Sequence, residues 1–346
     1  MSAAMAPSSV GNASDRIVRT MAISRAPSQD LMRLTTRIAT MYYERRLNQR
    51  RIAEQLGLSQ ARVSRLLKQA ETLGIVRITV HVPEGVHAGI EEALEARYGL
   101  DELIVVEVAD ADALNDDQLN QSMSSTVAAY LELVVPSFET IGVSSWSSAL
   151  MAAVNAMRPA GPGETKSIVQ VMGGLGFASA QVFATRLTER LAQLSKAEAI
   201  FMLAPGVVSS QATKAAMLTD PSCRQALDRF DQLSALLMGI GAIPPSRMLR
   251  AAGNVFNVQD LTDLRDAGAV GDVCLRYFDA DCRHVPTAFD ERVLGIGVGQ
   301  IRRTRRRIAV AGGARKFGAI RAALRGQWVT TLITDLHTAE QLLAHS

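Results

Sequence analysis

The sequence predicts a multidomain protein in which an N-terminal all-α, winged helix-turn-helix module is followed by a C-terminal α/β domain of the Rossmann-like kind. Three observations lead to this prediction. Residues 48–74 read as two short amphipathic helices separated by a glycine turn. Positive charge is concentrated in the same region. From about residue 88 onward, apolar strand-like runs alternate with helical segments, which is the pattern of a parallel sheet covered on both faces.

Length and composition agree with two domains. The 346 residues exceed one typical domain, and a hydrophobic content of 48% is sufficient for two cores. We divide the chain into a disordered tail (1–29), a helix-turn-helix domain (30–85) and a C-terminal domain (86–346). No apolar run approaches the roughly 20 residues of a membrane helix. The N-terminus lacks the pattern of a secretory signal, and three cysteines outside any C-x-x-C pair suit a reducing compartment, so we expect a cytoplasmic protein without membrane contact.

The first 28 residues are rich in Ala, Ser and Pro and show no sustained periodicity, which predicts a mobile tail. Its arginines could contact an anionic partner, but an unstructured leader without a role is the simpler interpretation. A helix is expected from about Asp30 to Arg46. Its apolar stripe can cover the two-helix unit that follows.

The two-helix unit has the layout of a helix-turn-helix, whose second helix lies in the DNA major groove. The first helix is expected from Gln49 to Leu56 and ends at Gly57. Ser59 stands where an N-cap hydroxyl would accept from the first free amides of the second helix. That helix buries Val63, Leu66 and Leu67 and leaves its polar residues outward. The predicted DNA-contacting residues are Arg50, Arg51, Ser59, Gln60, Arg62, Ser64, Arg65 and Lys68.

Charge separates this interpretation from its alternative, an ordinary pair of bundle helices joined by a glycine turn. Between Leu31 and Val80 there are ten Lys or Arg against three acids, a net of +7, whereas the whole chain carries +3, so the remaining segments sum to −4. A basic module on a slightly acidic body is the electrostatic pattern of phosphate binding. We therefore expect DNA as a partner.

After the second helix, residues 75–82 (IVRITVHV) alternate like a short strand, which suits a wing or an edge strand. Pro-Glu-Gly at residues 83–85 then breaks the pattern and marks the expected domain boundary.

The C-terminal domain is expected to contain nine strands: ELIVVEV, TIGVSS, SIVQVMGG, AIFMLAPG, SALLMGIGA, AVGDVCLRYF, RVLGIGV, RIAVAGG and VTTLITD. Helices are expected near residues 89–98, up to 134, 147–157 and 181–194. Ligands of such sheets bind outside the C-terminal strand ends, where the strand order reverses. Glycines follow several of these strands, but none has the spacing of a dinucleotide fingerprint or a P-loop.

Six segments together resemble the SorC family of bacterial sugar-responsive transcriptional regulators, and the resemblance covers almost the whole chain after residue 30. The segments are IAEQLGLSQARVSRLLKQAETLGIV, LAPGVVSS, MGIGA, GAVGDVCLRYFDAD, IAVAGGARKFGAIRAALRG and LITDLHTAEQLL. The resemblance implies a sugar-binding effector domain of the NagB/RpiA type. It also implies a homo-oligomer, a dimer of dimers, whose binding to operator DNA responds to a sugar, a sugar alcohol or a sugar phosphate.

The resemblance further implies an effector pocket made of Ser144, Trp146, Ser147, Ser148, Gln181, Asp272 and Lys316. The serine hydroxyls and amides at a helix start suit a polyol or a phosphate. Asp272 would accept from sugar hydroxyls, and Lys316 would pair with phosphate. Two alternatives remain open: Asp272 caps a helix or pairs with an Arg, and Lys316 only complements helix ends or water.

Three positions depart from the family pattern. Members often carry W-G-x-T where this chain has Trp146, Ser147, Ser148 and Ala149, and some place a polar or basic residue at the position of Met172. These departures remove one threonine hydroxyl and one close backbone approach. We predict a small sugar or polyol effector and leave its phosphorylation open.

The competing class is a sugar-phosphate isomerase or deaminase-like enzyme with an appended DNA-binding domain. Such chemistry needs a positioned base and acid, but the five histidines are scattered and show no spacing signature. We therefore expect no catalytic residues, no metal site and no cofactor. The arginine run at residues 302–307 (RRTRRR) is interpreted as a solvated connector or an oligomer contact rather than a second DNA contact.

Overall fold

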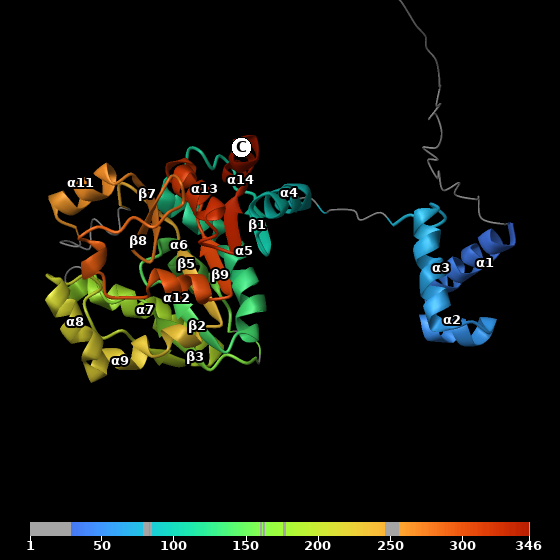
Figure 1. Cartoon of the computed structure of the whole chain (residues 1–346), viewed down its shortest axis with the longest axis horizontal. Helices are drawn as coiled ribbons and strands as arrows, with labels where there is room; N and C mark the ends of the chain where they lie inside the picture. The colour runs from blue at the N-terminus through green and yellow to red at the C-terminus, as the bar shows by residue number, and fades with distance from the viewer. Residues whose placement is uncertain are drawn as a thin grey trace, which may run out of the picture. The chain divides into compact units, whose positions relative to one another are not determined.

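The computed structural model describes residues 29–345 except 79–82, 84, 160, 162, 176–177 and 246–255. The chain forms two compact units, Met1–His81 and Val82–Ser346 (Figure 1). The predicted mobile tail lies outside the described residues. In the part of the chain that the structure describes, every helix is too short or too polar to traverse a lipid bilayer.

The N-terminal unit is helical, as predicted. Helix α1 (Gln29–Ala39) continues into a π-helical turn, η1 (Thr40–Glu44), and is followed by α2 (Gln49–Leu56) and α3 (Gln60–Thr72). One apolar cluster joins the three helices. Its buried members are Ile38, Met41, Ile52, Ala53, Val63, Leu66 and Leu67.

Capping residues set the ends of these helices. The Ser59 hydroxyl accepts from the Arg62 N–H at 3.3 Å, and Gly57 has a φ of 64°, so the predicted N-cap and glycine turn are both confirmed. A left-handed φ costs glycine little because it has no Cβ. Asn48 caps α2 in the same way, since its side-chain oxygen accepts from the Arg51 N–H at 2.9 Å.

The predicted strand of the wing does not begin at residue 75 as expected. Residues 75–78 form a bend and irregular backbone rather than a strand, and residues 79–82 lie outside the described residues. The N–H groups of Ile75 and Val76 donate to the Ala70 carbonyl, at 2.9 and 3.2 Å. These donors therefore close the C-terminal end of α3 and are not available to a β-ladder.

The C-terminal unit is built on one parallel sheet of seven strands. Its order is β1-β10-β9-β5-β2-β3-β4, and every pairing is parallel. The strands are β1 (Glu102–Val106), β2 (Thr140–Val143), β3 (Ser167–Gln170), β4 (Glu198–Ile200), β5 (Ala235–Gly239), β9 (Arg306–Val310) and β10 (Thr331–Asp335).

Helices cover both faces of this sheet, and the alternation of strand residues decides which face each side chain joins. Leu236 and Met238 belong to the apolar cluster of one face, whereas Ala235 and Leu237 belong to the other. The first face packs against α4 (Ala88–Tyr98), α9 (Pro221–Leu227), α12 (Val298–Arg303), α13 (Phe317–Arg325) and α14 (Leu336–Ala344). The second face packs against α5 (Asp116–Val134), α6 (Ser148–Ala156) and α7 (Ala178–Ser195).

The remaining elements lie between these strands in sequence. Helix α8 (Gln211–Thr219) precedes α9. Helix α11 (Val258–Asp266) lies, in sequence, between the first two strands of a small antiparallel sheet of order β6-β7-β8. Its strands are β6 (Gly241–Ala242), β7 (Ala269–Val273) and β8 (Arg276–Asp279). Short helical turns complete the unit: η2 (Val135–Ser137), η3 (Phe230–Gln232), η4 (Asp290–Arg292) and η5 (Ala314–Lys316).

Three of the nine expected strands differ from the prediction. SALLMGIGA is divided into β5 of the parallel sheet and β6 of the antiparallel sheet. AVGDVCLRYF forms a hairpin, not one strand, because Cys274 and Leu275 both have positive φ and make a two-residue turn between β7 and β8. RVLGIGV contains only isolated bridges, at Val293 and Gly295. The carbonyls of Gly295 and Ile296 instead accept from the Arg276 guanidinium, which draws them out of a regular ladder.

The strand order reverses between β2 and β5. These strands are neighbours, but the chain leaves β2 toward β3 and β4 and leaves β5 toward β9 and β10. The loops at their C-terminal ends therefore diverge and leave a crevice, which is the general ligand position in open α/β sheets.

Candidate functional site

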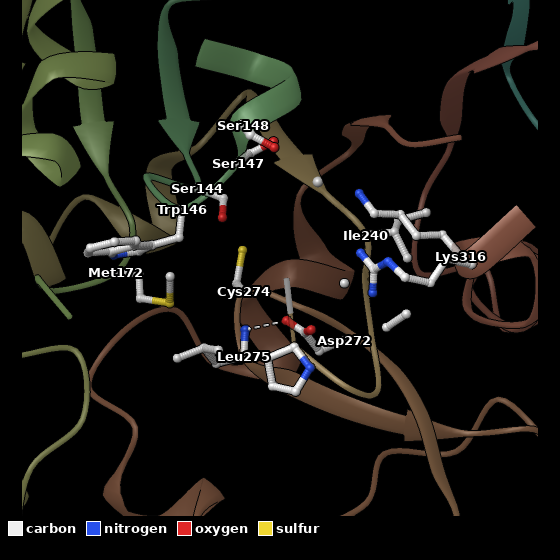
Figure 2. A pocket seen from close by; sticks show the side chains of 15 residues that line it. Ser144, Trp146, Ser147, Ser148, Met172, Ile240, Asp272, Cys274, Leu275 and Lys316 are labelled. Atoms are coloured by element: carbon white, nitrogen blue, oxygen red, sulfur yellow. Dashed lines mark hydrogen bonds between the residues drawn. The ribbon is translucent and has the colours of Figure 1, made fainter. Parts of the chain in front are cut away.

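A cavity opens at this reversal point, where the loops that follow β2, β5 and β9 meet the β7–β8 hairpin (Figure 2). The space between its walls, including the part open to solvent, is about 590 Å³. Six of the seven predicted pocket residues line it: Ser144, Trp146, Ser147, Ser148, Asp272 and Lys316. The seventh, Gln181, belongs to α7, and its side chain lies outside what the structure describes.

The serine loop is held in place by hydrogen bonds to both sides. The Ser144 N–H donates to the Leu237 carbonyl at 2.9 Å, which continues the β2–β5 ladder into the loop. Ser147 caps α6, since its hydroxyl accepts from the Leu150 N–H at 3.2 Å, and Ser148 accepts from the Asn120 amide at 2.9 Å. In these two bonds the hydroxyl oxygens of Ser147 and Ser148 are acceptors, so their hydrogens can be donated to oxygen atoms of a ligand.

Trp146 forms an apolar wall of the cavity. Its ring is buried together with Met172, Leu275 and Tyr277 in one cluster, and its Nε1–H donates to the Gly173 carbonyl at 3.4 Å. Figure 2 shows Trp146 and Met172 side by side at one end of the pocket, away from Lys316. An apolar wall opposite polar groups suits a ligand that has both C–H and hydroxyl surfaces, such as a sugar.

Asp272 projects from β7 against the backbone of Gly241. A Cβ at position 241 would lie 2.0 Å from the Asp272 Oδ1 atom, so only glycine fits there. The Oδ2 atom accepts from the Leu275 N–H at 3.0 Å. Burial raises the pKa of Asp272 to about 6, although the Leu275 hydrogen bond and the Lys316 charge oppose this shift. Asp272 thus fixes the hairpin turn, and within the described contacts it neither caps a helix nor pairs with an arginine.

Lys316 is the last residue of η5 and directly precedes α13, and it is buried, with 9% of its surface exposed. Burial lowers its pKa, while the charges of Asp116 and Asp272 act in the opposite direction. In Figure 2 its side chain approaches the cavity from the side opposite Trp146. The cavity therefore places a cation, a carboxylate and several hydroxyls around one volume.

Several lining residues are not among the predicted effector contacts, for example Gly241, Cys274 and Arg315. Gly241 and Arg315 belong to glycine-containing segments at strand ends, residues 239–241 and 312–316, which is a local signal for a ligand site. Cys274 follows a strand that the sequence pattern extended too far. Burial raises the pKa of its thiol to about 12, so the group stays protonated. In the described part of the chain no three His, Cys, Asp or Glu side chains gather in a way that could hold a metal ion.

The predicted DNA-contacting residues lie on the exposed side of the N-terminal unit. All eight are exposed: Arg50, Arg51, Ser59, Gln60, Arg62, Ser64, Arg65 and Lys68. Three of these side chains already have intramolecular partners. The Ser59 hydroxyl caps α3, Arg50 pairs with Glu54 at 3.2 Å, and the Arg65 Nε–H donates to the Ala61 carbonyl at 3.4 Å. Helix α3 therefore presents one polar face opposite the buried Val63, Leu66 and Leu67.

The arginine run at residues 302–307 is engaged within its own unit. Arg303 pairs with Asp231 at 2.6 Å, and Arg306 pairs with Asp101 at 3.5 Å and also with Glu102. Arg302 covers the Trp328 ring at 4.8 Å from its centroid, and Arg307 donates to backbone carbonyls. These contacts support the interpretation of the run as a connector.

Comparisons with known proteins match both halves of the chain. Residues 86–344 match the family described as "Putative sugar-binding domain", and residues 34–72 match "Sigma-70, region 4". The chain is 28% identical over 320 residues to the sorbitol operon regulator of Klebsiella pneumoniae, and the alignment covers 91% of this chain and 99% of that protein. It is 29% identical over 317 residues to the deoxyribonucleoside regulator of Bacillus subtilis, with 91% and 98% covered.

A solved structure shows the same combination of folds. The crystal structure of the full-length sorbitol operon regulator SorC from Klebsiella pneumoniae superposes with a TM-score of 0.67 at 26% identity, over 90% of this chain and 98% of that one. A helix-turn-helix unit and a parallel-sheet sugar-binding unit are therefore combined in both proteins.

Proposed function

Because this chain belongs to the SorC family of sugar-responsive transcriptional regulators, we propose that its cavity binds a small sugar, sugar alcohol or sugar phosphate, which controls the affinity of α3 for operator DNA. The observation that carries this proposal is the convergence of six predicted residues on one cavity at the β2/β5 reversal point. Relatives named as regulators of sorbitol, deoxyribonucleoside and erythritol genes support a polyol or sugar class of effector.

The geometry supplies the contacts that such a ligand needs. Asp272 accepts from ligand hydroxyls, and the hydroxyls of Ser144 and Ser148 donate to ligand oxygens. Lys316 supplies a positive charge, and the Trp146 ring covers the C–H face. In a partly apolar cavity, a small number of polar groups usually fixes the orientation of the bound molecule.

Control of DNA binding follows from a shift in populations. An effector that binds one arrangement of the assembled chains better than another favours that arrangement. The distance between the α3 helices of two chains then changes, and the affinity for a palindromic operator depends on that distance. This mechanism requires a homo-oligomer, which we propose to be a dimer of dimers, and light scattering of the full chain with and without operator DNA tests it.

Intrinsic fluorescence gives a direct binding assay. The chain contains two tryptophans, both in the C-terminal unit, and Trp146 lines the cavity. Titration with C4 to C6 sugars, sugar alcohols and their phosphates should change this signal, and calorimetry should return the same dissociation constants. Lys316→Gln should weaken binding of the active ligand, whereas Lys166→Gln, at an exposed position paired with Glu139, should not. Failure of all panel members to bind the wild-type chain would reject the proposal.

A second candidate function is catalysis, because Asp272 and Lys316 place a carboxylate and an amine in the same cavity. General acid–base chemistry uses such pairs. We propose that the chain regulates without turning over its ligand, since its relatives are named as regulators and no described histidine lines the cavity. Conversion of sugar phosphates by the purified chain, followed by NMR, would contradict this.

A further inference from the structure

Arg315 joins three segments at the edge of the cavity that it lines together with Lys316. Its Nε–H donates to the Asp116 Oδ2 atom at 3.1 Å, and a second guanidinium nitrogen also contacts the Asp116 carboxylate. Its third nitrogen donates to the Pro244 carbonyl at 3.1 Å. The β9 loop, the start of α5 and the segment after β6 are thus held by one side chain.

Asp116 is held where a carboxylate is favourable. It is the first residue of α5, directly after the capping residue Asn115, so the partial positive charge of the helix N-terminus stabilises its negative charge. Its carboxylate faces the Nε and Nη2 edge of Arg315, which is the edge that matches a carboxylate or a phosphate with two parallel hydrogen bonds. Asp116 therefore occupies the edge of the Arg315 guanidinium that can also bind a phosphate group.

The charges around the cavity are balanced in this arrangement. The charged lining residues that the structure describes are Asp272, Arg315 and Lys316, and the bond from Asp116 offsets the charge of Arg315. A ligand without charge can enter without disturbing this balance. A phosphate dianion would add negative charge beside Asp116, unless that carboxylate leaves the guanidinium.

We propose that the Asp116–Arg315 ion pair sets the preference of the cavity between phosphorylated and unphosphorylated effectors. A phosphorylated ligand binds by replacing the Asp116 carboxylate on the Arg315 guanidinium, which releases the first turn of α5. An unphosphorylated ligand leaves the pair closed. This inference rests on the proposed effector role of the cavity and specifies how that cavity chooses its ligand.

The test compares erythritol, xylitol and glucitol with their terminal monophosphates, each titrated into the full chain and followed by Trp146 fluorescence. Asp116→Asn removes the competing carboxylate but keeps its size. It should strengthen binding of the monophosphates by about tenfold and change binding of the parent polyols by less than about twofold. Arg315→Gln should remove this gain, so that Asp116→Asn has no further effect in the Arg315→Gln background.

Asp117→Asn is the matched control, because it removes the same charge from the next residue of the same helix turn. Asp117 is exposed and its charge acts on Lys316, so its loss should strengthen binding of the monophosphates less than Asp116→Asn does. Equal gains from Asp116→Asn and Asp117→Asn would overturn the inference, as would a gain that persists in the Arg315→Gln background. If no probe binds the wild type, the effector role of the cavity is rejected. If the probes bind but Asp116→Asn does not change the preference between monophosphates and polyols, only the exchange at Arg315 is rejected. Thermal melting of each variant checks that the fold is intact.

Discussion

At the scale of single residues, the cavity depends on close approaches that leave no room for larger groups. Gly241 touches the Asp272 carboxylate, and Asp272 in turn holds the Leu275 amide of the hairpin turn. The Gly241 backbone, the Asp272 carboxylate and the β7–β8 turn therefore depend on one another. A substitution at any of them should change both the stability of the C-terminal unit and its affinity for ligand.

Gly241→Ala should destabilise the C-terminal unit by about 1–3 kcal/mol, because the new Cβ must displace the Asp272 side chain. Chemical denaturation followed by the fluorescence of Trp146 and Trp328 measures this unit. Gly318→Ala in α13 is the matched control, since a Cβ there meets nothing within 4 Å. It should be neutral or slightly stabilising, and an equal loss in both variants would refute the explanation.

Asp272 should also make stability depend on pH. Its folded-state pKa of about 6 lies above the ordinary value of 3.8, so folding favours the protonated form. Its contribution to stability is therefore fully present below about pH 4 and is lost as the pH rises through about 6. Asp272→Asn should remove this dependence, and the difference in unfolding free energy between the two proteins should grow by roughly 1–3 kcal/mol over that interval. A constant difference across pH 4–7 would argue against it.

At the scale of elements, the start of helix α3 is set by a local cap, whereas the turn of the β7–β8 hairpin is maintained by its surroundings. Helix α3 is capped by Ser59, which fixes where its first turn begins and which residues stand at its N-terminal end. The β7–β8 hairpin turns at Cys274 and Leu275, both with positive φ and both buried beside the cavity. Positive φ is costly for residues other than glycine, so the surrounding contacts must maintain this turn.

Arg62→Ala should weaken binding of the chain to its operator by about 1–3 kcal/mol if Arg62 contacts a base edge. Binding to unrelated DNA should fall much less, so the ratio of specific to non-specific affinity decreases. Arg77→Ala removes the same charge at an exposed position after the helix and is expected to leave that ratio unchanged. Fluorescence anisotropy with operator and scrambled duplexes at fixed salt gives both numbers, and an unaltered ratio for Arg62→Ala would assign base contacts to other residues of α3.

At the scale of the whole molecule, effector and operator binding must be coupled in both directions. If the effector changes operator affinity by some factor, operator DNA must change effector affinity by the same factor, because both describe one thermodynamic cycle. This requirement holds whether the effector releases the chain from DNA or strengthens its binding.

The reciprocal factors can be measured on the same protein. Operator affinity is determined by anisotropy with and without saturating effector, and effector affinity by Trp146 fluorescence with and without saturating operator DNA. Equal factors different from one are expected. Factors of one in both directions would show that the cavity does not control DNA binding.

The sequence by itself determined what is local in this protein. The helix-turn-helix follows from Gly57, Ser59 and the spacing of apolar residues, because turns and caps act within a few residues. Net charge marked the same segment, and apolar runs predicted most strands of the parallel sheet. The six predicted residues that line the cavity came from the resemblance of short segments to the SorC family.

Only the tertiary structure decided what depends on contacts between distant segments. The β7–β8 hairpin replaces a predicted single strand, since its turn is maintained by Asp272 and by burial rather than by Asn or Gly in the turn itself. The segment RVLGIGV does not form the predicted strand, because the carbonyls of Gly295 and Ile296 accept hydrogen bonds from the Arg276 guanidinium. The pairing of Arg315 with Asp116 joins residues 199 positions apart, and such a contact leaves no periodicity in the sequence.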